Sequence, residues 1–326
     1  MFRKAAAALA VGVTIVALTG CASGSSDSGG SDAGSGEAGG LITVIVNDLA
    51  NPYWTAEADT AAAEAESLGY ESKIGSHNGD SKKESDLVDT AITNKSVAVI
   101  LDPADANGSI GAVKKLVAAD IPVFLVNAEI NEEGLAQSQL VANNAQGAAL
   151  GAAAWVEAVG PAGEYVELTG RPADNNAATR SNGFASVISQ YPDLKLVGSE
   201  VANWDQKEGN EKMQTLLAAH PNIVGVIAGN DPMALGAIAA LKAAGKLDQI
   251  KVGGFDGAPD AAQAITDGSL QYTVLQPVVD FTKSAVQQAD SYIRTGETGV
   301  DEEKQSFDCI LINKDNVASY GNFSIE

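Results

Sequence analysis

The amino-acid sequence predicts an α/β fold with two Rossmann-like lobes, each built on a parallel sheet, from Leu41 onward. Of the 326 residues, 45% are apolar and only 5% aromatic, with 34 glycines, which is typical of the aliphatic cores of α/β proteins. Short β-branched runs alternate with longer Ala-rich amphipathic stretches, the pattern of parallel strands connected by helices. Eleven such runs are too many for one small doubly wound sheet, so we expect two lobes.

The expected strands are short apolar runs bounded by turn residues. They span residues 41–47, 71–75, 97–101, 123–126, 140–142, 165–168, 195–199, 223–227, 251–253, 272–275 and 309–312. Stretches with helical spacing of apolar residues lie between most of them, among them 53–67, 206–219, 232–244 and 258–266.

The N-terminal 20 residues are typical of a secretory signal peptide. Arg3 and Lys4 precede a short apolar stretch, residues 5–18, which is too short and too Ala-rich for a transmembrane helix. The stretch ends in Leu18-Thr19-Gly20-Cys21, which resembles a bacterial lipobox. We therefore expect cleavage before Cys21 and lipidation of this cysteine; the alternative is an ordinary signal peptide with an incidental cysteine. Residues 21–40, mostly Gly, Ser, Ala and Asp, would tether the protein to the outer face of the cell membrane with a reach of roughly 25 Å.

The charge balance argues against nucleic acid or an anionic membrane surface as a partner. The net charge is 20 − 42 = −22, whereas a phosphate-binding face requires clustered Lys and Arg. Cys21 and Cys309 are too few for a disulfide framework and have no metal-site spacing, and we expect Cys309 to be a buried packing thiol. His77 and His220 are isolated, so we expect surface or capping roles for them. The sequence predicts no metal and no cofactor.

Polar and aromatic side chains follow nearly every expected strand. Open parallel sheets bind ligands beyond the carboxyl ends of their strands, so two facing sheets would bring these groups into one cleft. Taken singly, each Asn or Asp is equally well explained as a turn or N-cap residue, but their recurrence favours a site. The set comprises Asn51, Tyr53, Trp54, Asp102, Asn127, Asp174, Asn175, Asn176, Arg180, Asn203, Trp204, Asn230, Asp231, Asp256 and Gln276.

The chemistry of this set suits a neutral, polyhydroxylated ligand. Amides and carboxylates exchange hydrogen bonds with hydroxyls, the planar guanidinium of Arg180 can hold two of them, and aromatic faces cover the C–H side. Trp54 and Trp204 lie in these loops, whereas we expect Trp155, in a helix, to belong to the core. The folded region has no phosphate-binding GxxxxGK[ST] loop and no GxSxG nucleophile elbow, so we expect a binding protein and not an enzyme.

Four motifs, in order and at matching spacing, resemble those of the ribose-type, type I periplasmic sugar-binding proteins of ABC importers. They are Asn51-Pro52-Tyr53-Trp54, Ala178-Thr179-Arg180-Ser181-Asn182-Gly183-Phe184, Gly229-Asn230-Asp231-Pro232-Met233-Ala234-Leu235-Gly236 and Val252-Gly253-Gly254-Phe255-Asp256-Gly257. The resemblance covers residues 41–313. It implies a monomer whose two lobes close around the ligand by hinge motion, in a form that the permease recognises.

Carried over to matching positions, the resemblance implies ligand contacts from both lobes. Tyr53 and Trp54 would form an aromatic wall beside Asn51 in the first lobe. The contacts of the second lobe would be Arg180, Trp204, Asn230 and Asp256, with Asp174 and Asn176 just before Arg180 and Gln276 at a hinge. Three crossovers, near 142–144, 275–277 and 308–309, would divide the chain into a signal peptide (1–20), a tether (21–40), an N-terminal lobe (41–142 plus 277–308) and a C-terminal lobe (143–276 plus 309–326).

One position departs from the family pattern. Ribose binders usually carry an Asp-Arg pair after the fourth strand, where this chain has Asn127-Ala128, followed by Glu129. The missing Arg removes a bidentate grip on sugar hydroxyls, and Asn127 replaces a charged acceptor. We therefore expect Asn127 and Glu129 to face a tetritol, a pentitol or an inositol, with an ordinary aldopentose or hexose as the alternative.

Three other functions are compatible with parts of the sequence: a sensory receptor, a transcription regulator and an enzyme. A receptor that presents its ligand to a membrane sensor would have the same cleft. A transcription regulator of this fold is disfavoured by the secretory signal and the absence of a basic helix-turn-helix. A sugar-modifying enzyme would need a base, a nucleophile or a metal constellation. We therefore predict an extracytoplasmic solute-binding lipoprotein that captures a small polyol or monosaccharide for an ABC transporter.

Overall fold

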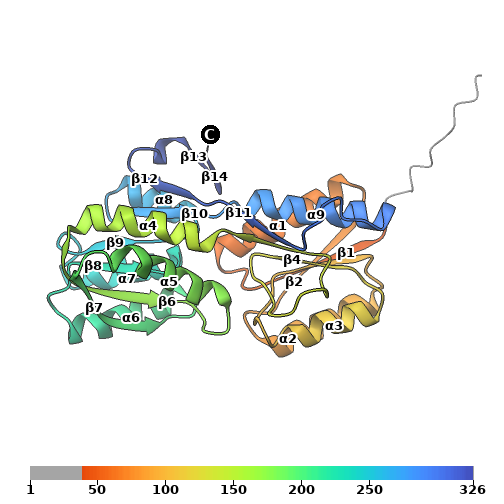
Figure 1. Ribbon diagram of the computed structural model, residues 1–326, viewed down its shortest axis with the longest axis horizontal. Coiled ribbons are helices and arrows are strands. Elements are labelled where there is room, and N and C mark those ends of the chain that lie inside the picture. Colours follow the sequence, from red (N-terminus) through yellow and green to blue (C-terminus); the bar gives the residue numbers. More distant parts are fainter. Residues whose placement is uncertain (1–38, 326) are drawn as a thin grey trace, which may run out of the picture. The chain divides into compact units, whose positions relative to one another are not determined.

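The computed structural model describes residues 39–325, which all belong to one compact unit. The predicted signal peptide, Cys21 and most of the tether lie outside the described residues. Two six-stranded sheets with helices on their faces form two lobes, which confirms the predicted fold (Figure 1). The strand orders are β11-β5-β4-β3-β1-β2 and β12-β10-β9-β8-β6-β7.

The strands and helices of the described chain have the following bounds. The strands are β1 (Leu41–Val46), β2 (Glu71–Ser76), β3 (Ala98–Leu101), β4 (Val123–Val126), β5 (Ser138–Ala142), β6 (Ala162–Thr169), β7 (Asp193–Val201), β8 (Gly225–Ala228), β9 (Lys251–Gly253), β10 (Tyr272–Leu275), β11 (Lys304–Phe307), β12 (Ile310–Asn313), β13 (Tyr320–Gly321) and β14 (Ser324–Ile325). The helices are α1 (Pro52–Ser67), α2 (Ser81–Thr93), α3 (Ile110–Ala118), α4 (Asn144–Val159), α5 (Asn175–Ile188), α6 (Gln206–Ala219), α7 (Asp231–Ala243), α8 (Pro259–Thr266), α9 (Val278–Thr295) and the 3₁₀ turn η1 (Val317–Ser319).

The sheet of the first lobe is parallel throughout and is covered on both faces. Helices α1 and α9 lie on one face, and α2 and α3 lie on the other (Figure 1). Successive residues of a strand point to opposite faces, so Val44 and Val46 join the core beneath α1 and α9, whereas Ile45 joins the core beneath α2 and α3. Burial of both faces explains why the central strands β1, β3 and β4 are nearly continuous apolar runs.

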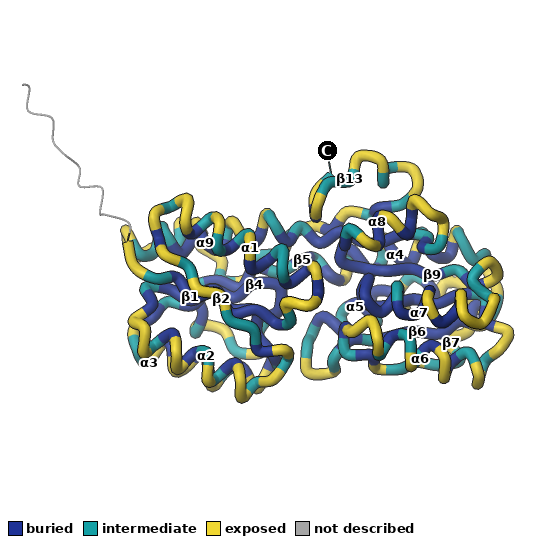
Figure 2. The backbone as a smooth tube through the Cα atoms, turned by 180° about the vertical axis from the view of Figure 1, so that it is seen from behind, coloured by how far each residue is buried: buried dark blue, intermediate teal, exposed yellow. Residues whose placement is uncertain are grey.

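The sheet of the second lobe is parallel except for β12, which pairs antiparallel with β10. Helix α4 packs against α5, and α6 packs against α7. Trp155 of α4 is fully buried, as predicted, and its Nε1 donates to the carbonyl of Lys251 at 3.4 Å. Figure 2 shows that the central strands of both lobes are buried, whereas the edge strands β2, β7 and β11 carry exposed residues.

The chain passes between the two sheets three times. It leaves the first sheet after β5, returns after β10 through α9, which packs on β4 and β5, and crosses again between β11 and β12. Cys309 lies at the last passage and is 4% exposed. Burial raises the pKa of its thiol to about 12, so Cys309 is a neutral packing residue, as predicted.

The expected surface position of His77 was wrong, and three strands were not predicted. His77 is not a surface residue: it is fully buried, its Nδ1 accepts from the Gly79 amide at 2.9 Å, and its Nε2 donates to the Asp102 carbonyl at 2.8 Å. Burial lowers the pKa of His77 to about 4 and keeps the ring neutral. Strand β11, an edge strand of alternating exposure, and the hairpin of β13 and β14 were not predicted.

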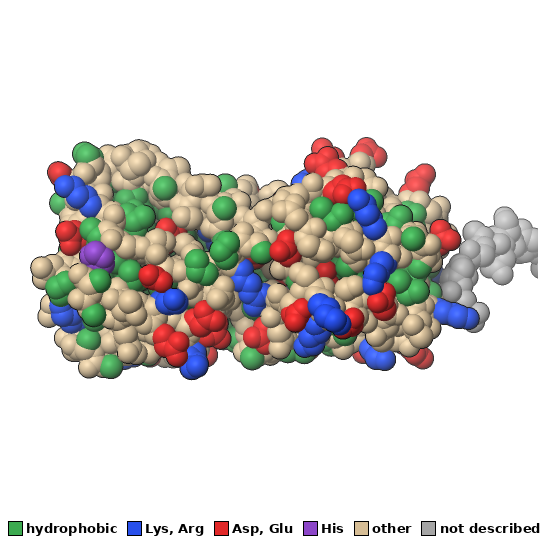
Figure 3. Space-filling model, turned by 90° about the horizontal axis from the view of Figure 1, so that it is seen from below, with side chains coloured by type: hydrophobic (Ala, Val, Ile, Leu, Met, Phe, Trp, Pro, Cys, Tyr) green, Lys and Arg blue, Asp and Glu red, His purple; other side chains and the backbone are tan. Residues whose placement is uncertain are grey.

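Charged side chains are scattered over the surface. Figure 3 shows acidic and basic groups intermixed on one face of the molecule. Within residues 39–325, no helix is long and apolar enough to span a membrane.

Candidate functional site

Side chains from the carboxyl ends of strands in both lobes line one small cavity. Its free volume is about 10 Å³, roughly the room for one water molecule, so the side chains lie close together around it. Ten of the twelve residues proposed as ligand contacts lie around it: Tyr53, Trp54, Asn127, Asp174, Asn176, Arg180, Trp204, Asn230, Asp256 and Gln276.

The first lobe contributes an aromatic wall from the first turn of α1. Asn51 is the N-cap, and its Oδ1 accepts from the amide of Tyr53 at 3.0 Å, while Pro52 fits the first helical position. The rings of Tyr53 and Trp54 meet edge to face, with centroids 6.4 Å apart. Trp54 Nε1 is buried and lies close to the carboxylate of Asp102, and this N–H acts to lower the pKa of that carboxyl group against the larger effect of burial.

Asn127 organises the first lobe through its side chain and connects it to the second lobe through its backbone carbonyl. Its Oδ1 accepts from the Tyr53 hydroxyl at 3.0 Å, and its Nδ2 donates to Asp102 Oδ2 at 3.0 Å. Its carbonyl accepts from Asn176 Nδ2 of the second lobe, also at 3.0 Å. The residue has a φ of 62°, in the left-handed region that Asn tolerates better than most residues. Its side-chain amide therefore orients Tyr53.

Arg180 is the charged centre of the second lobe and is 4% exposed. Its Nε donates to Asn144 Oδ1 at 2.7 Å, and its Nη1 donates to the Gly229 carbonyl at 2.8 Å and to Asp256 Oδ1 at 3.2 Å. The guanidinium carbon lies 3.9 Å from the centroid of the Phe255 ring. Several fixed partners therefore hold the guanidinium in one plane beside the cavity.

Asp256 balances this charge. Its φ of 122° is unusual for a residue other than glycine, and such strain is concentrated at functional sites. Burial raises the pKa of its carboxyl group to about 6, while Arg180 acts in the opposite direction, so the group is ionised at neutral pH. Gln276 Nε2 donates to Asp256 Oδ1 at 2.7 Å, and the buried Gln276 Oε1 has no protein partner. Gln276 thus offers the ligand an acceptor.

Trp204 forms the aromatic surface of the second lobe. Its Nε1 donates to Asp174 Oδ2 at 3.1 Å, and Asn230 Nδ2 donates to its carbonyl at 3.1 Å. Its φ of 68° places a bulky residue in the left-handed region, a strained conformation. The indole lies directly over Gly170, where an added Cβ would come within 1.9 Å of the ring.

The two remaining candidates lie elsewhere. Glu129 does not line the cavity: one of its carboxylate oxygens lies 3.4 Å from Lys304 Nζ, because the chain after Asn127 turns toward the first-sheet edge that β11 occupies. Asn51 lines a neighbouring, larger hollow that shares Trp54 and Trp204 with the cavity.

Three supporting residues were not on the list of predicted contacts. Asn144 accepts from Arg180 and donates to Asn176 Oδ1 at 2.9 Å, and Phe255 lies under the guanidinium. Arg171 Nη1 donates to Asn47 Oδ1 of the first lobe at 3.0 Å. Phe255 belongs to a quoted motif and Asn144 to a predicted crossover, but no pattern in one sequence indicated what they would support.

The arrangement is that of a binding site for hydroxyl groups. It combines one fixed guanidinium, two carboxylates, several amides and three aromatic residues. Among residues 39–325, no group of His, Cys, Asp and Glu is arranged to hold a metal ion. The chemistry that these groups supply is hydrogen bonding and aromatic contact.

The fold and the site define a two-lobed solute-binding protein. The chain belongs to the family of the periplasmic binding protein domain, whose family model matches residues 42–298. It is 50% identical over 287 residues to the D-apiose import binding protein of Actinobacillus succinogenes, covering 88% of this chain and 92% of the relative. It is 31% identical to the ribose import binding protein of Escherichia coli, covering 78% and 84% of the two chains. These relatives confirm the predicted resemblance to sugar-binding proteins of ABC importers.

A solved structure supports the same classification. An ABC transporter periplasmic solute-binding protein from Actinobacillus succinogenes, with bound D-allose, superposes with a TM-score of 0.80 at 26% identity. The match covers 86% of this chain and 100% of the other. The protein is thus a sugar- or polyol-binding component of ABC import, and members of its family are solute-binding proteins and not enzymes.

Proposed function

We propose that the protein binds D-apiose, a small branched-chain sugar, in the cavity between the lobes and delivers it to an ABC permease. The observation that carries this proposal is the buried group of Arg180, Asp256 and Gln276 facing the aromatic wall of Tyr53 and Trp54. The 50% identity to a D-apiose import binding protein supports the choice among small sugars.

The polar groups are sufficient for useful affinity. Micromolar binding requires about −8 kcal/mol. A typical net hydrogen bond contributes about 1 kcal/mol, and those to charged groups about 1.5–3 kcal/mol. Contacts with Arg180, Asp256 and Gln276, together with packing on the aromatic rings, are of the right size after the costs of lobe closure.

The part of the cavity around Asn127 argues against ribose as the principal ligand. The side-chain amide of Asn127 is occupied by Tyr53 and Asp102, and Ala128 supplies no guanidinium. Glu129 is directed to Lys304. This part of the cavity therefore offers no charged group to a pair of hydroxyls. It favours a ligand that is bound mainly by residues of the second lobe. The same feature favours an acyclic polyol as the second candidate.

The decisive experiment is isothermal titration calorimetry of the purified protein, freed of bound ligand, with D-apiose, D-ribose and xylitol. We expect D-apiose to bind with a Kd in the micromolar range or below and at least about tenfold more tightly than the others, equivalent to about 1.4 kcal/mol. Tighter binding of xylitol would favour the polyol, and tighter binding of D-ribose would contradict both candidates. Mass spectrometry of a ligand that co-purifies with the protein provides an independent identification.

We further propose that the mature protein is a lipoprotein anchored through Cys21, which lies outside the described residues. The lipobox-like Leu18-Thr19-Gly20-Cys21 carries this proposal. In a bacterial host that processes lipoproteins, Cys21→Ala should abolish incorporation of labelled palmitate and leave the signal peptide uncleaved, whereas Cys309→Ala should change neither. Unchanged palmitate incorporation in the Cys21 variant would contradict the proposal.

A further inference from the structure

We propose that the C-terminal hairpin, formed by β13 and β14, is a positioning element of the ligand site and that Phe323 acts through Tyr53. This inference rests on the proposed function, because it assigns a role in binding to residues that line no part of the cavity. The hairpin also lies beyond the residues that match the family model.

The hairpin is attached to the second lobe. Strands β13 and β14 pair antiparallel, and the preceding turn η1 packs on α8. The Tyr320 hydroxyl donates to the Gly257 carbonyl at 2.6 Å and accepts from the Phe323 amide at 3.1 Å. Gly257 directly follows Asp256, whose strained backbone carries the carboxylate of the site. One end of the hairpin therefore fixes the chain beside Asp256.

The tip of the hairpin contacts the first lobe. Phe323 is 3% exposed, although its neighbours Asn322 and Ser324 are exposed. Its ring meets that of Tyr53 edge to face, with centroids 6.0 Å apart and an interplanar angle of 76°. Phe323 is the one buried residue of the hairpin, whose other residues are half-buried or exposed, so this contact helps to hold the hairpin in place.

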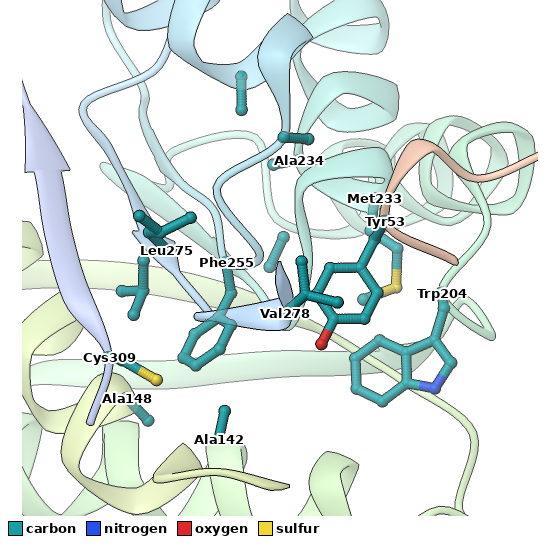
Figure 4. Packing of buried hydrophobic residues seen from close by; sticks show 14 of the residues in the cluster. Tyr53, Ala142, Ala148, Trp204, Met233, Ala234, Phe255, Leu275, Val278 and Cys309 are labelled. Carbon is teal, nitrogen blue, oxygen red and sulfur yellow. The ribbon is translucent and has the colours of Figure 1, made fainter. Parts of the chain in front are cut away.

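Tyr53 is therefore held by two hydrogen bonds and two ring contacts. Asn51 holds its amide, Asn127 holds its hydroxyl, and its ring lies edge to face with those of both Trp54 and Phe323. Figure 4 shows Tyr53 in the same buried cluster as Trp204 and Phe255 of the second lobe. Because Phe323 comes from the second lobe, its contact with Tyr53 joins the lobes and favours their closed arrangement.

The test compares Phe323→Ala with Ile325→Ala in the full chain. Ile325 is a half-buried apolar residue of the same hairpin, packed against the same core. We expect Phe323→Ala to weaken D-apiose binding about 3- to 10-fold, the effect of losing one aromatic pair, through faster dissociation. We expect Ile325→Ala to keep the wild-type affinity. Equal losses in the two variants would show a merely structural role and would overturn the proposal.

A double-mutant cycle separates action through Tyr53 from direct action. In a Tyr53→Leu background, Phe323→Ala should cause little further loss of affinity, whereas additive losses would contradict the proposal. Phe323→Leu retains apolar bulk without a ring and replaces Phe323→Ala if that variant fails to fold.

A measurement without ligand keeps this inference distinct from the proposed function. The ¹⁹F signal of fluorotyrosine at position 53, assigned by its loss in Tyr53→Phe, should shift in Phe323→Ala and remain in place in Ile325→Ala. An unchanged signal would overturn the contact even if D-apiose binds. If no sugar binds the wild-type protein, the proposed function fails, and this signal still decides whether Phe323 positions Tyr53.

Discussion

Replacing Arg180 with alanine should reduce ligand affinity by at least about 100-fold. Arg180 supplies the fixed cation of the cavity, and hydrogen bonds to charged groups contribute about 1.5–3 kcal/mol each. Loss of two such bonds to ligand hydroxyls gives roughly this factor, since every 1.4 kcal/mol corresponds to tenfold. The measurement is calorimetric titration of the variant with the ligand identified for the wild-type protein.

Stability must be followed in the same variant. Arg180→Ala leaves the buried carboxylate of Asp256 without its charge partner, and removing one member of a buried pair costs about 3–5 kcal/mol. Arg180→Lys keeps a charge near Asp256 but loses the planar guanidinium, so it should fold better and still bind weakly. Wild-type affinity in either folded variant would exclude Arg180 from the site.

The core strands could be predicted from sequence because they are buried on both faces. Strand β4 reads Val-Phe-Leu-Val and β8 reads Gly-Val-Ile-Ala, runs that only a covered sheet accommodates. Strand β11, with the sequence Lys-Gln-Ser-Phe, lies at the edge of its sheet and has no apolar run. Its place depends on pairing with β5, which is distant in sequence.

The residues of the site that lie at the ends of strands could be predicted from the sequence. Residues at the carboxyl ends of strands, such as Asp256 and Asn230, follow from the order of elements alone. Glu129 shows the limit: it lies two residues after Asn127, yet the direction of the intervening chain pairs it with Lys304. The hairpin that carries Phe323 shows a second limit. Its residues, 320–325, have no apolar periodicity that would indicate which surface they pack on.

Gly170→Ala should reduce affinity about 20- to 100-fold, equivalent to roughly 2–3 kcal/mol. The new Cβ would lie within 1.9–2.2 Å of three indole atoms of Trp204, so the ring must leave its place above the glycine. Displacement breaks the bond from Trp204 Nε1 to Asp174 and removes the aromatic face from the cavity. Overpacking of this kind also costs stability, about 1–3 kcal/mol.

The matched control is Gly111→Ala, since a Cβ at Gly111 meets no atom within 4 Å. This variant should bind like the wild type and be slightly more stable, because alanine favours the helix more than glycine does. The double variant Gly170→Ala with Trp204→Ala removes the clash but also removes a buried indole, so it should regain neither affinity nor stability. If Gly170→Ala alone binds normally, the indole is not a wall of the ligand site, and the selectivity of the second lobe must come from Arg180 and Asp256 without it.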